Sequence, residues 1–242
     1  AEFQFMGFSY TGLDQIINHA SRIKTRMRST KTAAIVYRIP CGVQINAPEH
    51  HAESTEALFC HIPGLRVVYP SNPKAAYDLM RESIHCQDPI VYLEPIGSYQ
   101  KKGSIHKSNT EYNLNKAVIE KEGSDITIIS WGLMLERVRQ IVKKIGNSIN
   151  IELIDLVNLK PIDYKTLLQS VEKTGRCIII QESNITCSLA SEISATISDK
   201  KIEYLRCPVK RVSPEDIVMP YYQKIDSYIP QDNEIIEICR NL

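Results

Sequence analysis

The sequence predicts an α/β protein with two mainly parallel sheets, each flanked by helices. Short runs of β-branched and apolar residues alternate with helical segments, which is the pattern of parallel strands joined by right-handed crossovers. The alternation is interrupted at residues 97–115, where Ser, Lys, Asn and Gly replace the apolar periodicity. We therefore expect two domains, residues 1–110 and residues 117–242, joined by a linker.

The first domain opens on an apolar, strand-like run at residues 1–5, which indicates that the chain starts inside a domain. A helix is predicted at 14–28, where apolar residues recur at helical spacing. Asp14 lies near its start and Lys24 and Arg28 near its end, as the helix dipole favours. Strands are then predicted at residues 35–39, 65–69 and 90–93, with helices at about 54–62 and 73–86.

The second domain repeats the alternation with strands that are apolar throughout. Such strands are typical of a doubly wound sheet, in which both faces are buried. Ligands of these sheets bind at the carboxyl ends of the strands, so functional residues are expected in the loops that follow them. The predicted strands cover residues 126–131, 151–156, 177–181 and 209–212, and the helices cover about 134–145, 163–172, 188–198 and 232–240.

Composition and charge exclude several classes of protein. The 242 residues include 29 Lys+Arg and 28 Asp+Glu, and only 7% are aromatic, so no surface for a nucleic acid is indicated. No apolar stretch approaches the roughly 20 residues that span a bilayer. The seven cysteines are widely spaced, form no zinc or redox motif and cannot all pair, which favours a reducing compartment.

The segment of residues 38–57 carries the densest chemistry in the sequence. It follows a predicted strand and places His50 and His51 among three carboxylates at the start of a helix. Histidine titrates near neutral pH, so this pattern predicts an acid–base site. In the alternative interpretation, Ser54 or Thr55 caps the helix and the histidines are solvated. The motifs of phosphate-binding loops, zinc proteases and serine hydrolases do not occur in the sequence.

Several stretches, taken in order, point to one family. They include Ala1-Glu-Phe-Gln-Phe-Met-Gly-Phe, Pro48-Glu-His-His-Ala-Glu-Ser-Thr-Glu-Ala-Leu-Phe, His61-Ile-Pro-Gly-Leu-Arg-Val-Val-Tyr-Pro-Ser, Asp88-Pro-Ile-Val-Tyr-Leu-Glu-Pro, Trp131-Gly, Leu159-Lys-Pro-Ile-Asp and Pro208-Val-Lys-Arg-Val. Together they cover essentially the whole chain. In them the chain resembles the beta subunit of the thiamine-diphosphate-dependent first component of 2-oxo acid dehydrogenase complexes.

This resemblance implies that residues 1–110 are the C-terminal part of a pyrimidine-binding domain and residues 117–242 a transketolase-type C-terminal domain. It also implies that thiamine diphosphate is bound between the first domain and an alpha subunit, which holds the diphosphate and magnesium. By matched position, Phe8 packs on the aminopyrimidine ring and Gln4 lines the same pocket. His51 matches the catalytic histidine that faces the substrate and the lipoyl group, and metal ligands within this chain stay unassigned.

The chain departs from the family pattern at several positions. Gly42-Val43-Gln44 stands where relatives often have three glycines, Val157 where they have Arg, and Thr186-Cys187-Ser188 where they often have Thr-Gly-Gly. The activating glutamate of the family belongs to a stretch upstream of Ala1, so the isolated chain is expected to be inactive. Some relatives also bind a monovalent cation through loop carbonyls, at positions that match Ala33, Ile35, Val36, Ser83, Cys86 and Asp88.

The function that the resemblance implies is oxidative decarboxylation of pyruvate or a branched-chain 2-oxo acid, with transfer of the acyl group to lipoyl. The implied partners are the alpha subunit, a second beta subunit and the lipoyl-bearing acyltransferase core, in the bacterial cytoplasm or the mitochondrial matrix. We interpret the second domain as a docking element, because acidic residues gather towards its end. Two alternatives are a non-catalytic remnant that keeps only subunit contacts and another transketolase relative, such as a deoxyxylulose-phosphate synthase.

Overall fold

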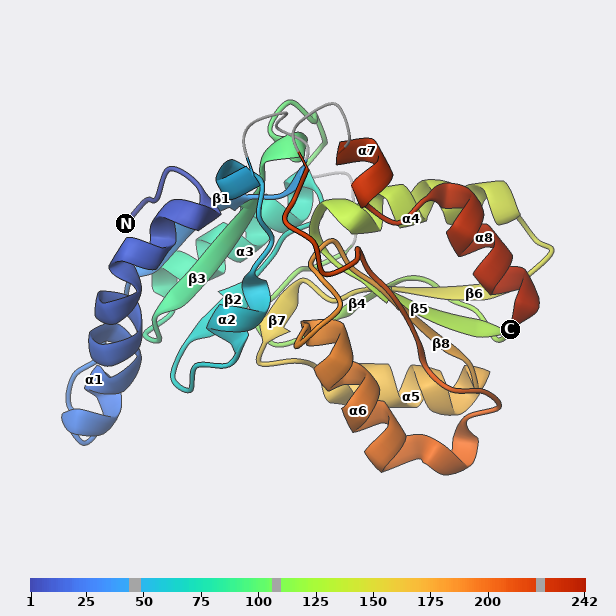
Figure 1. Cartoon of the computed structure of the whole chain (residues 1–242). Coiled ribbons are helices and arrows are strands. Elements are labelled where there is room, and N and C mark those ends of the chain that lie inside the picture. The colour runs from blue at the N-terminus through green and yellow to red at the C-terminus, as the bar shows by residue number, and fades with distance from the viewer. Residues whose placement is uncertain (44–48, 106–109, 221–224) are drawn as a thin grey trace.

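The computed structural model describes residues 1–43, 49–105, 110–220 and 225–242. These residues form two sheets flanked by helices (Figure 1), which confirms the predicted α/β class. The first sheet contains β1 (Val36–Cys41), β3 (Ile90–Pro95), β2 (Arg66–Val68) and β7 (Asn158–Lys160), in that order. The second sheet has the order β4 (Val118–Lys121), β6 (Ile151–Asp155), β5 (Ile126–Ser130), β8 (Cys177–Ile180) and β9 (Lys210–Val212).

The parallel part of the first sheet sets the position of the loop that carries the histidines. Strands β1 and β2 both pair in parallel with β3, so their carboxyl ends lie at the same edge of the sheet. The short helix α2 (Glu56–Cys60) follows the loop after β1, and α3 (Pro73–His85) follows β2. Asn72 caps α3, because its side chain accepts the backbone N–H of Ala75, and Pro73 supplies a favourable first turn.

The N-terminal segment combines an extra strand-like stretch with a helical run of mixed type. The backbone N–H of Phe3 donates to Arg38 O at 3.0 Å and that of Arg38 donates to Ala1 O at 2.9 Å, so the first residues lie beside β1. The predicted helix at 14–28 is present in altered form, because its hydrogen-bond pattern changes along the run. It consists of a π-helix η2 (Gln15–Ala20) and α1 (Ser21–Arg26), and a 3₁₀-helix η1 (Met6–Gly12), which the sequence pattern does not predict, precedes it.

The central strands of the second sheet, β6, β5 and β8, are buried on both faces, as the apolar runs predict, whereas the edge strands β4 and β9 are partly exposed. Helices α4 (Gly132–Ile145) and α8 (Asp232–Asn241) cover one face, and α5 (Tyr164–Thr174) and α6 (Leu189–Lys201) cover the other (Figure 1). Side chains alternate between the two: Ile128 belongs to the cluster with α4 and α8, and Ile129 to the cluster with α5 and α6. That second cluster continues into the first sheet, so one apolar core joins the two halves.

Two further contacts join the halves of the chain. Strand β7 comes from the second half of the sequence but pairs antiparallel with β2 of the first sheet. Arg139 of α4 donates to the Ser71 hydroxyl at 2.7 Å, and that hydroxyl donates to the buried carboxylate of Asp155 on β6. Strands β4 and β7 are not predicted from the sequence pattern. Both pair antiparallel with their neighbours.

Two general properties of the described residues bear on function. No helix among them is both long enough and apolar enough to cross a membrane. All seven cysteines are free thiols, and Cys41, Cys177 and Cys239 are buried.

Candidate functional site

A cluster of four aromatic rings lies at the carboxyl end of β1. Phe5 and Phe8 come from the N-terminal segment, and His50 and His51 from the short helix η4 (Glu49–His51). The His51 ring lies 4.7 Å from the Phe5 ring and 5.5 Å from the Phe8 ring, both edge to face, and 4.1 Å from the His50 ring. The structure therefore brings together two of the three residues that the resemblance predicted for the site, Phe8 and His51.

Gly7 allows this close packing of the two segments. A Cβ atom at position 7 would lie 2.3 Å from the carbonyl oxygen of His50, a distance that no side chain tolerates. Glycine therefore lets η1 approach the backbone of η4 directly. Gln4, the third predicted residue, is exposed on the stretch that leads into η1.

The histidine cluster offers polar atoms and ring surface to a ligand. The Nδ1 atom of His51 and one carboxylate oxygen of Glu49 are buried, and neither has a hydrogen-bond partner among the described residues. Buried polar atoms are rarely left unpaired, and such exceptions mark sites for an additional group. Phe8 retains 38% of its surface exposed, so one apolar ring is open beside these atoms.

Hydrogen bonds fix η1 to the residues that follow His51. The Tyr10 hydroxyl donates to the Glu53 carboxylate and lies 3.0 Å from the Thr55 hydroxyl. Burial and the Glu53 carboxylate raise the pKa of Tyr10, so its hydroxyl remains a donor. Thr55 occupies the N-cap position of α2 but makes no capping hydrogen bond, and Ser54 instead donates to Glu182 at 3.3 Å. The interpretation of Ser54 or Thr55 as a helix cap is therefore wrong.

Two buried glutamates lie behind this loop, between the two sheets. Glu56 is 0% exposed, and the indole Nε1 of Trp131 donates to it at 3.0 Å. Burial is the largest of the effects that raise the pKa of Glu56 to about 7, and the neighbouring Glu182 raises it further. Glu182 follows β8 and accepts the backbone N–H of Val43 at 2.6 Å, while burial raises its pKa as well. Neither Glu182 nor Trp131 has a predicted role, although Glu182 follows the predicted strand at 177–181 and Trp131 ends the one at 126–131.

Two of the departures from the family pattern, Val157 and Cys187, fall at strained backbone positions. Gly42, which keeps the first glycine of the family pattern, has a φ of +102°, in the region that favours glycine, and Glu182 approaches it closely. Val157 and Cys187 have φ angles of 29° and 53°, which side chains other than glycine rarely adopt. Gln44 lies outside the described residues.

The positions matched to a monovalent cation are already engaged in internal contacts. The Asp88 carboxylate lies between Lys24 Nζ at 2.7 Å and Arg66 Nε at 3.1 Å, and these bonds lower its pKa. The Ile35 carbonyl accepts the Ile90 N–H at 2.9 Å, and the Ser83 carbonyl accepts the Cys86 N–H at 3.2 Å. Among the described residues, no group of three or more His, Cys, Asp or Glu is arranged to hold a metal ion. The chemistry proposed below does not depend on a cation at these positions.

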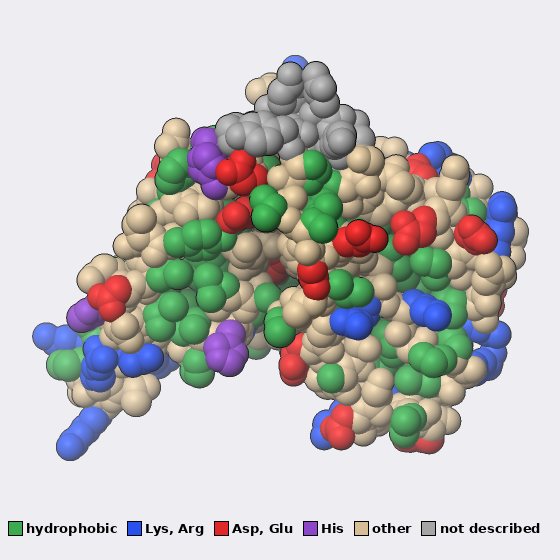
Figure 2. All heavy atoms as spheres, viewed as in Figure 1, with side chains coloured by type: hydrophobic (Ala, Val, Ile, Leu, Met, Phe, Trp, Pro, Cys, Tyr) green, Lys and Arg blue, Asp and Glu red, His purple; other side chains and the backbone are tan. Residues whose placement is uncertain are grey.

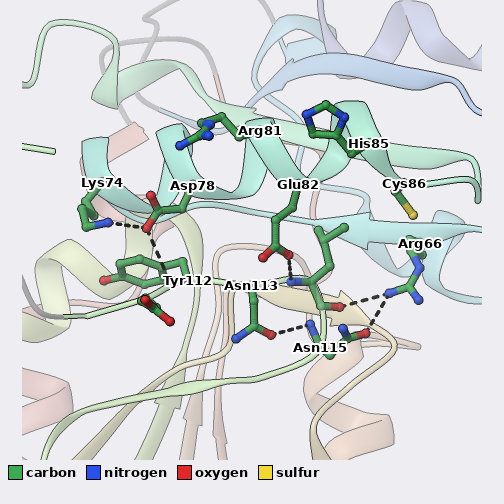
Figure 3. Close-up of a pocket in the computed structure, with 12 residues that line it drawn as sticks. Arg66, Lys74, Asp78, Arg81, Glu82, His85, Cys86, Tyr112, Asn113 and Asn115 are labelled. Carbon is green, nitrogen blue, oxygen red and sulfur yellow. Dashed lines mark hydrogen bonds and ion pairs between the residues drawn. The ribbon is translucent and has the colours of Figure 1, made fainter. Parts of the chain in front are cut away.

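A separate cavity of about 660 Å³ lies between α3 and the segment 111–115 (Figure 3). Its polar groups hold that segment in place: Glu82 accepts the Leu114 N–H at 2.8 Å, and Arg66 donates to the Leu114 carbonyl at 3.1 Å. Lys74 pairs with Asp78 at 2.6 Å. Because these charges are satisfied internally, the cavity is a weaker candidate than the histidine cluster.

Comparison with known proteins assigns both halves of the chain to families. Residues 1–102 match the family of the transketolase pyrimidine-binding domain, and residues 115–235 match that of the transketolase C-terminal domain. A solved structure titled "Split gene transketolase, inactive beta4 tetramer" has a TM-score of 0.80 at 18% identity, covering 98% of this chain and 73% of that one. At that identity the likeness concerns the fold.

Curated relatives show which members of this family the chain is similar to. The pyruvate dehydrogenase E1 component subunit beta of Staphylococcus epidermidis is 34% identical over 98% of this chain and 73% of its own length. The protein of the same name from Leifsonia xyli subsp. xyli is 37% identical, over 98% of this chain and 71% of its own. The chain therefore belongs to the thiamine-diphosphate-dependent, transketolase-like family, together with the beta subunits of pyruvate dehydrogenase.

Proposed function

We propose that this chain is the beta subunit of the first component of a 2-oxo acid dehydrogenase complex. In this role it decarboxylates pyruvate or a branched-chain 2-oxo acid oxidatively and passes the acyl group to lipoyl. The observation that carries the proposal is the Phe8 and His51 pair, which joins an open aromatic ring to a buried Nδ1 atom that has no hydrogen-bond partner among the described residues. The similarity to pyruvate dehydrogenase beta subunits supports it.

The residues of the cluster fit thiamine diphosphate. Phe8 presents an exposed ring on which a flat heterocycle packs, and Gln4 offers an exposed amide four residues before it. When bound, thiamine diphosphate supplies the carbon nucleophile and the electron sink that decarboxylation requires. An alpha subunit would hold its diphosphate and magnesium, so we expect the isolated chain to be inactive.

His51 would act as the acid–base group of the site. Its ring is held on two sides by Phe5 and Phe8, which fixes the direction of its nitrogens. An imidazole so positioned can donate a proton to the substrate oxygen. It can also donate a hydrogen bond that stabilises this oxygen as negative charge develops on it. His50, with its side chain 45% exposed, also lies beside Phe8, with the two rings 5.5 Å apart.

Association with other subunits would cover surfaces that are exposed in this chain. Apolar side chains gather between the N-terminal helical segment and α2 (Figure 2), and Phe8, Tyr10 and Leu58 are each 38% exposed. An alpha subunit and a second beta subunit are the proposed partners of this face. Towards the C-terminus, Asp232 is neutralised by Arg137 and Lys144, so docking of the lipoyl-bearing acyltransferase core there would depend on other acidic residues, such as Glu234.

The test is to purify this chain, extended by the upstream stretch that carries the activating glutamate in the family, with an alpha subunit, and to assay pyruvate against branched-chain 2-oxo acids with an artificial electron acceptor. We expect turnover in the assembly, with a strong loss in His51→Ala and a small one in His50→Ala. An assembly that forms but turns over none of these acids would favour the non-catalytic alternative. Reduction of a free lipoyl domain in the same assembly tests the acyl-transfer step.

A further inference from the structure

The loop that carries His51 has a closed base. The backbone N–H of Gly42 donates to the carbonyl of Glu53 at 3.3 Å, so the residue after β1 is bonded to the residue just before Ser54. Val43 directly follows Gly42, and Ser54 directly follows Glu53, so Val43 and Ser54 lie next to this hydrogen-bonded pair. The placement of His51 within the loop therefore depends on how firmly the base is held.

A side chain from the second sheet holds both sides of this base. Glu182 follows β8, is 6% exposed, and uses a single carboxylate oxygen to accept both the Val43 N–H at 2.6 Å and the Ser54 hydroxyl at 3.3 Å. Gly42 makes room for it, because a Cβ atom at that position would lie 3.0 Å from the same oxygen. One buried carboxylate thus bridges the start and the end of the His51 loop.

Trp131 makes a second link of the same kind. It follows β5 of the second sheet, and its indole donates to Glu56, two residues beyond Ser54. The strand ends of the second sheet therefore contact the first half of the chain on the C-terminal side of the loop at two points. Such buried hydrogen bonds are costly to lose, because the group left without its partner stays unsatisfied in the interior.

We propose that Glu182 is a positioning residue that orients His51 by fixing the base of its loop. The effect of this role on turnover rests on the function proposed above, whereas the effect on the His51 ring does not. Glu182 touches neither His51 nor the proposed ligand, and it acts through the backbone of Val43 and the Ser54 side chain. The second half of the chain thereby takes part in building the site.

The experiment compares three variants of the full chain. Glu182→Ala removes the acceptor, Glu182→Gln keeps its shape and one oxygen, and Ser54→Ala removes the weaker of the two bonds. Glu152→Gln is the control, because Glu152 is also buried and also accepts a backbone N–H, that of Gly123 at 3.3 Å, but lies on β6, where it pairs with Lys173. The His51 ring signals, assigned with His51→Ala, are followed by NMR, and thermal unfolding is measured in parallel.

We expect Glu182→Ala to shift the His51 ring signals, Glu182→Gln and Ser54→Ala to shift them less, and Glu152→Gln to leave them in place. In the assembly with an alpha subunit, Glu182→Gln should lower kcat about tenfold to a hundredfold, as small displacements of a catalytic group do, with little change in KM. Unmoved His51 signals in both Glu182 variants would overturn the proposal. Shifted signals with unchanged kcat would support the positioning role but contradict the catalytic role of His51.

Discussion

Replacing Glu56 by Gln should make the stability of this protein less sensitive to pH. Glu56 is fully buried, with Trp131 donating to one carboxylate oxygen and no partner for the other among the described residues. Burial raises its pKa from the ordinary value of 4.5 to about 7. The substitution removes this titration while leaving an oxygen that can still accept the indole N–H.

The size and sign of this pH effect on the unfolding free energy follow from the pKa of Glu56 in the unfolded and in the folded chain. In the unfolded chain Glu56 ionises near pH 4.5, whereas in the folded chain it stays protonated until about pH 7. Its stabilising effect is therefore complete below the unfolded pKa and is lost as pH rises through the folded pKa. The shift corresponds to about 3 kcal/mol of unfolding free energy, so wild type should lose about that much more than Glu56→Gln over this interval.

Urea unfolding at about pH 5 and about pH 8 measures the effect for both proteins. Other buried acids titrate in both, and any packing cost of the amide is the same at each pH, so these contributions cancel in the comparison. The unfolding free energy of Glu56→Gln relative to wild type should rise by about 3 kcal/mol between the two conditions. Equal pH dependence of the two proteins would refute the burial argument for Glu56.

Three further predictions concern the site. His51→Ala in the assembly with an alpha subunit should lower kcat about a hundredfold or more, against a small change in His50→Ala, in steady-state assays. Gly42→Ala should lower thermal stability by about 1–3 kcal/mol, because its φ is +102° and the new Cβ meets Glu182; an unchanged melting temperature would contradict this. Tyr10→Phe should shift the Phe8 ring signals in NMR spectra, because it frees η1 from Glu53 and Thr55, and unmoved signals would show that packing alone holds η1.

The elements with a strong apolar pattern could be predicted from the sequence, and the short antiparallel ones could not. Strands β5, β6 and β8 are buried on both faces, which leaves a continuous apolar run in the sequence. Strand β7 has only three residues, and its pairing with β2 depends on the packing of the two halves. Such a pairing is a tertiary property, and the local sequence carries little trace of it.

The candidate site shows the same division. The pattern of residues after the predicted strand indicates an acid–base site at His50 and His51, whereas Phe8 and Gln4 are assigned by family resemblance alone, because an ordinary core position is the simpler interpretation of Phe8. Glu182 lies 139 residues from Val43 in the sequence, so no local pattern could connect them. The rule that functional groups follow parallel strands did point to its position after β8, but not to its partner.

The second half of the chain contacts the loop that carries His51. Its acidic end predicts a docking element, in which Asp232 is paired within the chain, and the residues after β5 and β8 contact α2 and the His51 loop. A buried carboxylate on a strand end is costly to move, because its donors would be left unpaired in the interior. A shift between the two sheets would therefore displace Val43 and Ser54 together, and the orientation of His51 would follow the packing of the second sheet.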